Sequence, residues 1–209
     1  MCSIMYVPRH FEVTDRAWVL ELIERYPFGM LITGEGEYPR VSQIPMLAQQ
    51  RDDAIWVVGH LAKANPHARL IAAEAPATLV FCGPHAYVSA SWYEEPYETV
   101  PTWNYTAVHL CGRLRPFDPW RAVGLLSAKM EGTRGWNPQL LDPEYRAGQL
   151  AAIAAFEVRA DAVYAKAKLS QNRSDPDRRR VIDRLLGSPN EGERECGEAM
   201  LAQLEMEQR

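Results

Sequence analysis

The stretch that most constrains the fold is the alternating segment at residues 103–115. One of its faces carries Val108, Leu110, Gly112 and Leu114, and the other carries Tyr105, Ala107, His109, Cys111 and Arg113. A two-residue period is typical of a strand with one buried side. The segment therefore predicts a strand that contributes one face to a core.

Further strand-like segments follow one another with few helices between them. They are residues 28–33, 40–47, 54–61, 77–82, 86–90 and 153–159. The GEGEYP stretch supplies turn residues and joins the first two as a hairpin. Strands in such close succession favour an antiparallel barrel decorated by helices over repeated βαβ units.

Capping residues mark the expected helices. The first helix is expected from Thr14 to near Pro27, and a short second one from Asn65 and Pro66 to about Ala73. Two more are expected from Asp118 and Pro119 to about Glu131, and from Pro143 to about Ala152. A further helix is expected to begin at Asp175 and Pro176 and to end at Gly187. The segment from Pro189 to Arg209 reads as a helix of modest amphipathicity.

Composition excludes several classes of protein. The chain has 209 residues, a net charge of −4 and 47% hydrophobic residues, which suits one large domain and argues against broad coating of nucleic acid. Its four cysteines form no C-x-x-C pair, and Cys82 and Cys111 are expected to be small buried residues. Without a membrane-length apolar run or a signal-like start, the chain is predicted to be soluble and cytoplasmic.

Standard catalytic and metal-binding patterns do not occur. There is no dinucleotide fingerprint, P-loop, H-E-x-x-H or G-x-S-x-G motif, and no histidine pair has helical ligand spacing. We therefore predict no catalytic residues of these classes and no metal site.

An anion site is suggested at residues 59–69, GHLAKANPHAR. Lys63 supplies charge, Asn65 a side-chain cap, and the expected helix start free N–H groups, while Arg40 could converge from the neighbouring strand. The alternative is a solvated lysine beside an ordinary cap.

Three other stretches have two interpretations each. The aromatic loop at residues 92–105 could contact a ligand or only fill an interface. The polar run Ser170–Arg173 could bind the edge of a heterocycle or form a turn. The arginines at residues 178–184 alternate with aspartates, which favours an exposed ion-paired face over a nucleic-acid stripe.

Several motifs together resemble a known family. MYVPRHF, PFG, GHLAKANP, GPHAYVSASWYE, VPTWNYTAVHLCG and KAKLSQNR occur in the order found in the PaiB-type FMN-binding negative transcriptional regulators, from Met5 to about Leu186. The resemblance implies a mainly β fold with helices (α+β), a six-stranded antiparallel split barrel of the FMN-binding type, and a homodimer with FMN at the subunit interface. It also implies a barrel domain at residues 1–165 and a C-terminal helical extension at residues 166–209, packed on the barrel as a single structural unit.

The resemblance implies a set of cofactor-binding residues. They are Arg40, Val41, Ser42, Gln43, Ile44, Pro45, His60, Lys63, Asn65, Trp103, Asn104, Tyr105, Lys168, Ser170, Gln171, Asn172 and Arg173. Lys63 would hold the phosphate, and the residues from Trp103 onward would approach the ring or tail of the flavin. Three positions depart from the family pattern: Gln43 replaces a histidine, Ala90 a proline and Ala165 a glycine. Gln43 cannot titrate near neutral pH.

The leading functional hypothesis is a repressor that uses FMN as ligand or sensor. Any DNA contact is expected to use the helix from Asp175 to Leu186. The alternatives are an FMN-dependent oxidoreductase using NAD(P)H, and a structural dimer without flavin whose aromatic loop serves packing alone.

Overall fold

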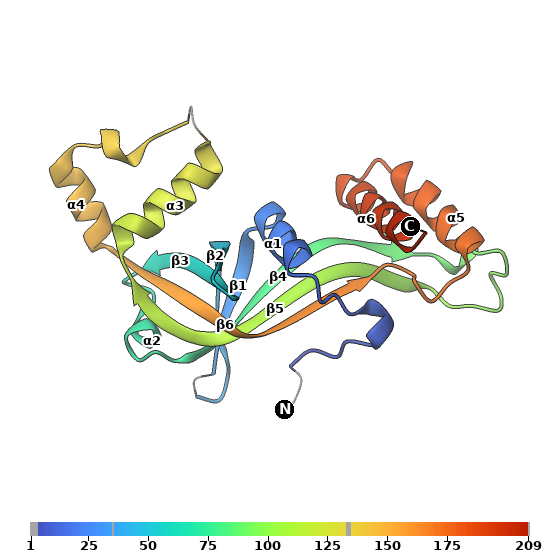
Figure 1. Ribbon diagram of the computed structural model, residues 1–209, viewed down its shortest axis with the longest axis horizontal. Coiled ribbons are helices and arrows are strands. Elements are labelled where there is room, and N and C mark those ends of the chain that lie inside the picture. Colours follow the sequence, from blue (N-terminus) through green and yellow to red (C-terminus); the bar gives the residue numbers. More distant parts are fainter. Residues whose placement is uncertain (1–3, 35, 133–134, 209) are drawn as a thin grey trace. The chain divides into compact units, whose positions relative to one another are not determined.

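The computed structural model describes residues 4–34, 36–132 and 135–208, and its sheet is a closed six-stranded barrel (Figure 1). The strands are β1 (Phe28–Thr33), β2 (Arg40–Arg51), β3 (Ala54–Ala62), β4 (Pro76–Val88), β5 (Thr102–Phe117) and β6 (Ile153–Lys168). Their order around the barrel is β1-β2-β3-β6-β5-β4, and the pairs β1–β2, β1–β4, β2–β3 and β3–β6 are antiparallel. The predicted six-stranded antiparallel barrel is confirmed.

Most of the helices begin where short polar side chains satisfy free N–H groups, the two exceptions being η1 and α2. They are η1 (Arg9–Phe11), α1 (Arg16–Arg25), α2 (Ala68–Ala72), η2 (Ala90–Trp92), α3 (Pro119–Glu131), η3 (Pro138–Leu140), α4 (Pro143–Ala151), α5 (Asp175–Leu186) and α6 (Glu191–Glu207). Asp118 caps α3 as predicted. Two caps were assigned one residue away from their true positions, because Asp15 rather than Thr14 accepts from the start of α1, and Ser174 rather than Asp175 caps α5.

Two expected elements differ from the structure. The strands predicted at residues 77–82 and 86–90 are one strand, β4, which continues through Gly83 and Pro84. Both of these residues are buried, and the exposed positions shift from Cys82 to His85 and Tyr87, a change of phase typical of a β-bulge. Cys82 follows the regular alternation before this point, on the opposite side from the buried Leu79 and Phe81, and is exposed instead of buried, while Cys111 is half-buried.

The chain forms two compact units. One contains residues 1–19, 82–108 and 164–209, and the other contains residues 20–81 and 109–163. We call them the helical unit and the barrel unit. The predicted boundary between residues 165 and 166 falls within β6.

The barrel unit owes its tight interior to glycines at points of close approach. A Cβ on Gly112 would lie 2.2 Å from the backbone oxygen of Arg159, and one on Gly59 would lie 2.8 Å from the Phe156 ring. Helix α3 covers the outside of β3, where Ala122 packs with Val58. The result is a filled barrel with one covered outer face.

The helical unit contains a second core in which α5 and α6 pack with β4 and β6. Its buried members are Ala86, Val88, Tyr93, Ala167, Leu169, Val181, Ile182, Leu185, Cys196, Met200 and Leu204. The segment from Pro189 onward is thus an integral part of this core up to the last described residue, 208. Burial and, secondly, the nearby Glu193 raise the pKa of Cys196 to about 12, so its thiol stays protonated.

Candidate functional site

A buried histidine organises one end of the barrel unit. His67 has no exposed surface, and its Nδ1 lies 2.9 Å from Ser42 Oγ while its Nε2 lies 3.1 Å from Thr33 Oγ1. Asn65 donates from Nδ2 to Ser42 Oγ at 3.2 Å and accepts from the His67 backbone N–H at 2.9 Å. This network fixes the loop after β3 against the first residues of β2.

The expected helix at Asn65–Ala73 is shorter than predicted. Helix α2 has five residues, begins at Ala68, and has no side-chain cap. The Asn65 side chain instead closes a turn, which leaves Pro66 outside the helix. The predicted cradle at a helix start is therefore replaced by a hydrogen-bonded loop.

Two predicted cations lie at this same end. Thr33 at the end of β1 is paired with Arg40 at the start of β2. Strand β3 runs antiparallel to β2, with Gly59 opposite Met46, so the end of β3 lies near the start of β2. Lys63 follows β3 and is exposed, whereas Arg40 is half-buried. Lys63 and Arg40 thus flank the His67 network.

Strand β2 divides the run predicted at Arg40–Pro45 between its two faces. Ser42 and Ile44 are buried, whereas Val41, Gln43 and Pro45 are exposed. Only the second group can touch a ligand lying on the outside of the barrel, because alternate side chains point to opposite faces.

His60, three residues before Lys63, is half-buried on β3. Its Nδ1 is buried and makes no hydrogen bond to the described residues. Burial lowers the pKa of this imidazole, so it is neutral near pH 7 and can donate or accept.

A pocket of about 430 Å³ opens beside Thr33. Its lining includes Gly34, Thr78, Cys111 and Arg113. Arg113 donates from Nη1 to the Glu74 backbone oxygen at 3.1 Å. No binding role was predicted for Thr33, His67 or Arg113, because they lie far apart in the sequence and only the fold brings Thr33 near the other two.

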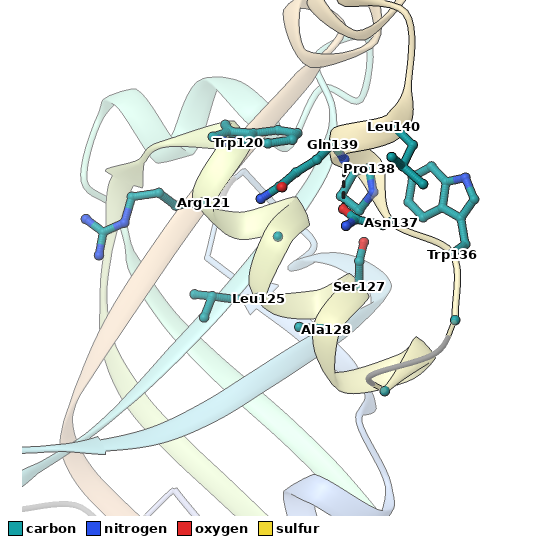
Figure 2. Close-up of a pocket in the computed structure, with 13 residues that line it drawn as sticks. Trp120, Arg121, Leu125, Ser127, Ala128, Trp136, Asn137, Pro138, Gln139 and Leu140 are labelled. Atoms are coloured by element: carbon teal, nitrogen blue, oxygen red, sulfur yellow. Dashed lines mark hydrogen bonds between the residues drawn. The ribbon is translucent and has the colours of Figure 1, made fainter.

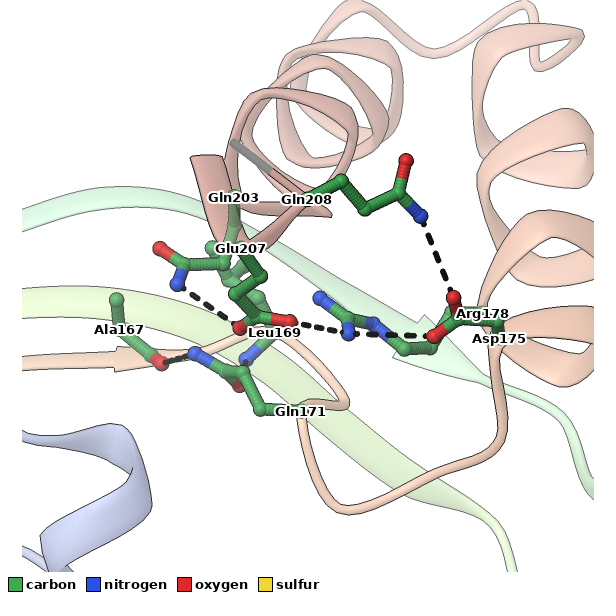
Figure 3. Close-up of polar contacts among 8 residues, drawn as sticks. All are labelled: Ala167, Leu169, Gln171, Asp175, Arg178, Gln203, Glu207 and Gln208. Carbon is green, nitrogen blue, oxygen red and sulfur yellow. Dashed lines mark hydrogen bonds and ion pairs between the residues drawn. The ribbon is translucent and has the colours of Figure 1, made fainter. Parts of the chain in front are cut away.

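In the helical unit, three of the eight predicted cofactor-binding residues are used in internal hydrogen bonds. Asn104 has no exposed surface and donates to Ser170 Oγ at 2.9 Å and to Met200 Sδ at 3.2 Å. Gln171 accepts from the Leu169 backbone N–H and donates to the Ala167 backbone oxygen (Figure 3). For Asn104, Ser170 and Gln171 the structure favours the turn-and-packing interpretation over contact with a heterocycle.

Two more of these eight residues, Trp103 and Lys168, lie where a ligand could reach an exposed ring or a positive charge. Trp103 is 54% exposed and lies 6.1 Å, centroid to centroid, from both His85 and Tyr87. Lys168 donates from Nζ to Thr102 Oγ1 and to the Trp103 backbone oxygen, each at 2.5 Å. Burial, followed by the charges of Lys166 and Arg173, lowers the pKa of Lys168.

The remaining predicted residues of this unit vary in accessibility. Asn172 is exposed, and Arg173 is half-buried with its guanidinium over the Tyr93 ring. The half-buried Tyr105 ring lies 5.1 Å from the Lys166 ammonium.

Arg178 of α5 is a structural residue. Its side chain is 4% exposed and its Nη1 lies 2.5 Å from a Glu207 carboxylate oxygen and 3.8 Å from Asp175 (Figure 3). The guanidinium thereby ties α5 to the end of α6.

The described residues contain neither a metal-ligand cluster nor a membrane-length helix. No group of three or more His, Cys, Asp or Glu side chains could hold a metal ion. No helix in the same residues has the length and apolarity needed to span a membrane.

The barrel topology and this polar end define a class, the split-barrel fold of flavoproteins. The chain superposes with a TM-score of 0.61 on the flavocytochrome Anf3 from Azotobacter vinelandii, at 16% identity and covering 82% of this chain and 77% of that one. A FAD- and heme-binding protein from Mycobacterium smegmatis gives 0.58 at 18% identity, covering 79% and 78% of the two chains. These similarities establish the fold.

Sequence comparison gives the family. Residues 5–162 match the model of the putative FMN-binding domain, and the chain belongs to that family. It is 34% identical over 202 residues to the protease synthase and sporulation protein PAI 2 of Bacillus subtilis, covering 94% of this chain and 96% of the relative. The PaiB-type resemblance and the expectation of FMN as cofactor are confirmed.

The residues at the Arg40 end of the barrel fit an FMN phosphate. Phosphate needs cations, and this end offers Lys63 and Arg40, while the Asn65 amide holds the loop that carries Lys63. His60 adds a buried ring nitrogen without a protein partner. Which of the predicted residues contact the flavin stays a prediction.

Proposed function

We propose that this protein is a cytoplasmic, homodimeric FMN-binding repressor in which the flavin acts as ligand or sensor. The observation that carries the proposal is the pair of cations, Lys63 and Arg40, beside the His67 network of a chain in the FMN-binding family. When bound, FMN supplies a ring that can accept and return electrons.

In the barrel unit, different residues have different roles in binding FMN. Lys63 and Arg40 neutralise the phosphate, while His67 and Asn65 hold the loop that carries Lys63 in place. On the outer face of β2, Gln43 offers an amide to the polar edge of a ring.

An FMN titration tests this assignment. Lys63→Ala removes a charge-assisted contact worth about 1.5–3 kcal/mol, so the Kd for FMN should rise by about tenfold or more. The control is Lys129→Ala. This change removes a lysine of α3 that is paired with Glu24 of α1, and it should leave the Kd unchanged. Equal Kd values for the parent protein and Lys63→Ala would refute the phosphate site.

If the protein represses by binding DNA directly, the exposed arginines of α5 would make the contact. Arg178 is committed to Glu207 and Arg180 is paired with Glu94, which leaves Arg179 and Arg184 on the exposed surface of the helix. Replacing both with Ala should reduce the salt dependence of operator binding by about two phosphate contacts. An unchanged slope would exclude α5 as the contact.

The rate of NADH or NADPH oxidation distinguishes the oxidoreductase alternative from a sensor. A sensor should oxidise NADH or NADPH no faster with FMN bound than free FMN does. Turnover well above that background, lost in Lys63→Ala together with flavin binding, would favour the enzyme.

A homodimer is supported by apolar residues on the outer face of β1 and β2. Phe28 is 66% exposed and Val41 51% exposed, and the register places Phe28 opposite Pro45 and Val41 opposite Ile32. Exposed apolar side chains gathered on one sheet face are typical of an interface, here with a second copy of the chain.

A further inference from the structure

The barrel unit contains a second pocket, which is lined by none of the predicted flavin-binding residues. It has a volume of about 690 Å³ between α3 and the segment that includes η3 (Figure 2). Its lining includes Trp120, Gly124, Ser127, Gln139 and Leu140. We call it the α3–η3 pocket, and no residue of the predicted flavin site lines it.

The walls of the α3–η3 pocket combine aromatic and aliphatic side chains with polar ones. Trp120 projects from the first turn of α3, and Trp136 and Leu140 lie together at the other end (Figure 2). Trp136 is 51% exposed and Leu140 85% exposed. A concave site of this volume that combines aromatic side chains with a few polar groups is typical of small-molecule binding, whereas protein partners usually meet flatter surfaces.

Charged groups near the pocket are engaged elsewhere. The Arg121 guanidinium lies 5.2 Å from the Phe117 ring and points away from η3, and Arg146 lies 4.9 Å from the Trp120 ring (Figure 2 shows Arg121). Glu131 accepts from the Trp136 backbone N–H at 3.1 Å. Arg121 is the charged residue among those that line the pocket, and its guanidinium points away from the η3 wall, so neutral side chains face a ligand at that wall.

Neutral polar groups remain available. Among the described residues, the Ser127 hydroxyl and the Gln139 carboxamide have no hydrogen-bond partner, and Asn137 holds η3 by accepting from the Gln139 backbone N–H at 2.9 Å. Figure 2 shows Gln139 extending beside Trp120 and Ser127 pointing toward Asn137. One hydroxyl and one amide beside indole rings suit a flat compound with a hydrogen-bonding edge.

We propose that the α3–η3 pocket binds a small, neutral, aromatic ligand of the amide type, separately from FMN. The ring packs between Trp120 and Leu140, and Gln139 pairs with the polar edge. The proposal does not depend on the flavin assignment.

Benzamide and benzoate are matched probes, since they differ mainly in charge. Ligand-observed NMR with the full-length protein should show benzamide binding in the low millimolar range or tighter, as expected for a ligand of this size, and at least about tenfold weaker binding of benzoate. No detectable benzamide binding, or equal binding of benzoate, would overturn the proposal.

The chain offers a matched pair of glycines for the control. A Cβ added at Gly124, which lines the pocket, or at Gly148 of α4, which does not, meets no atom within 4 Å. Gly124→Leu fills the pocket and should weaken benzamide by about tenfold or more, whereas Gly148→Leu should have no effect; both changes favour a helix, so folding should be retained. Benzamide bound equally by the two variants would place the ligand elsewhere and overturn the proposal.

A third variant tests the polar contact. Gln139→Leu removes the carboxamide and should weaken benzamide about threefold or more, consistent with loss of one hydrogen bond. Unchanged FMN binding in all three variants is expected, and a parallel loss of FMN binding would show that the pocket is part of the flavin site.

Discussion

At the scale of single residues, buried polar groups do more to define this protein than its exposed charges. His67 joins Thr33 and Ser42 by hydrogen bonds to both ring nitrogens, and all three residues are buried. A buried polar group that loses its partner pays a desolvation cost of about 1–3 kcal/mol, so these hydrogen bonds matter more than exposed ones.

His67→Ala should therefore destabilise the protein strongly. The change leaves two buried hydroxyls without their partner and opens a cavity, for an expected loss of about 2–4 kcal/mol in the free energy of unfolding. Urea denaturation measures it, with the exposed His10→Ala as control. A loss under about 1 kcal/mol would contradict the structural role assigned to His67.

The Arg178–Glu207 pair predicts a pH dependence. Burial acts to raise the pKa of Glu207, but hydrogen bonds from Arg178 and Gln203 and the charge of Arg178 lower it below its ordinary value of 4.5. A lowered folded-state pKa gives stability that is present above pH 4.5 and is lost as the pH falls through the lower value. Because Glu207 is partly exposed, we expect at most about 1 kcal/mol.

Glu207→Gln should flatten this dependence. Thermal unfolding of the parent protein and the variant between pH 6 and pH 3 compares the two slopes. Identical slopes would mean that the pair makes no contribution to stability in solution.

At the scale of elements, β5 and β6 approach more closely than side chains normally permit. Gly112 makes this possible, since an added Cβ would lie 2.2 Å from the Arg159 backbone oxygen. Backbone cannot move aside as a flexible side chain can, so the cost of a methyl group here is high.

Gly112→Ala should accordingly cost about 3 kcal/mol or more, or prevent folding. The control, Gly148→Ala on α4, should stabilise by a few tenths to about 1 kcal/mol, because Ala favours helix over Gly. The test compares the free energy of unfolding of each variant with that of the parent protein. Tolerance of Ala at Gly112 would show that β5 and β6 can separate.

The sequence predicted those elements whose signals are local. Asp118 followed by Pro119 marked α3, and the alternation from Val108 to Leu114 marked β5, because cap and period lie within a few residues. Helix α2 and the continuous β4 were mispredicted where tertiary pairing overrides local cues: Asn65 closes a turn instead of capping a helix, and β4 continues through Gly83 and Pro84.

The candidate site was predictable only in part for the same reason. Lys63 and Arg40 could be named from charge and position. The internal use of Asn104 could not, because its partner Met200 lies 96 residues away in the sequence. The pairing of His67 with Thr33 spans 34 residues and was likewise missed.

At the scale of the whole molecule, the outer face of β1 and β2 predicts self-association. Phe28→Lys places a charge on the face proposed to meet a second copy and should give a monomer by light scattering at micromolar concentration. Tyr97→Lys, which changes a fully exposed side chain of the helical unit, should not alter the mass. A Phe28→Lys protein with the mass of the parent would place any dimer interface elsewhere.

The path of the chain through its two units also affects how the protein is made. The barrel unit is interrupted by residues 82–108, and the helical unit is complete only with its final segment from residue 164. A nascent chain leaving the ribosome therefore holds an open sheet edge until β6, which lies between β3 and β5 in the barrel, has emerged. Chains stalled in the interval before β6 would be natural clients for chaperones.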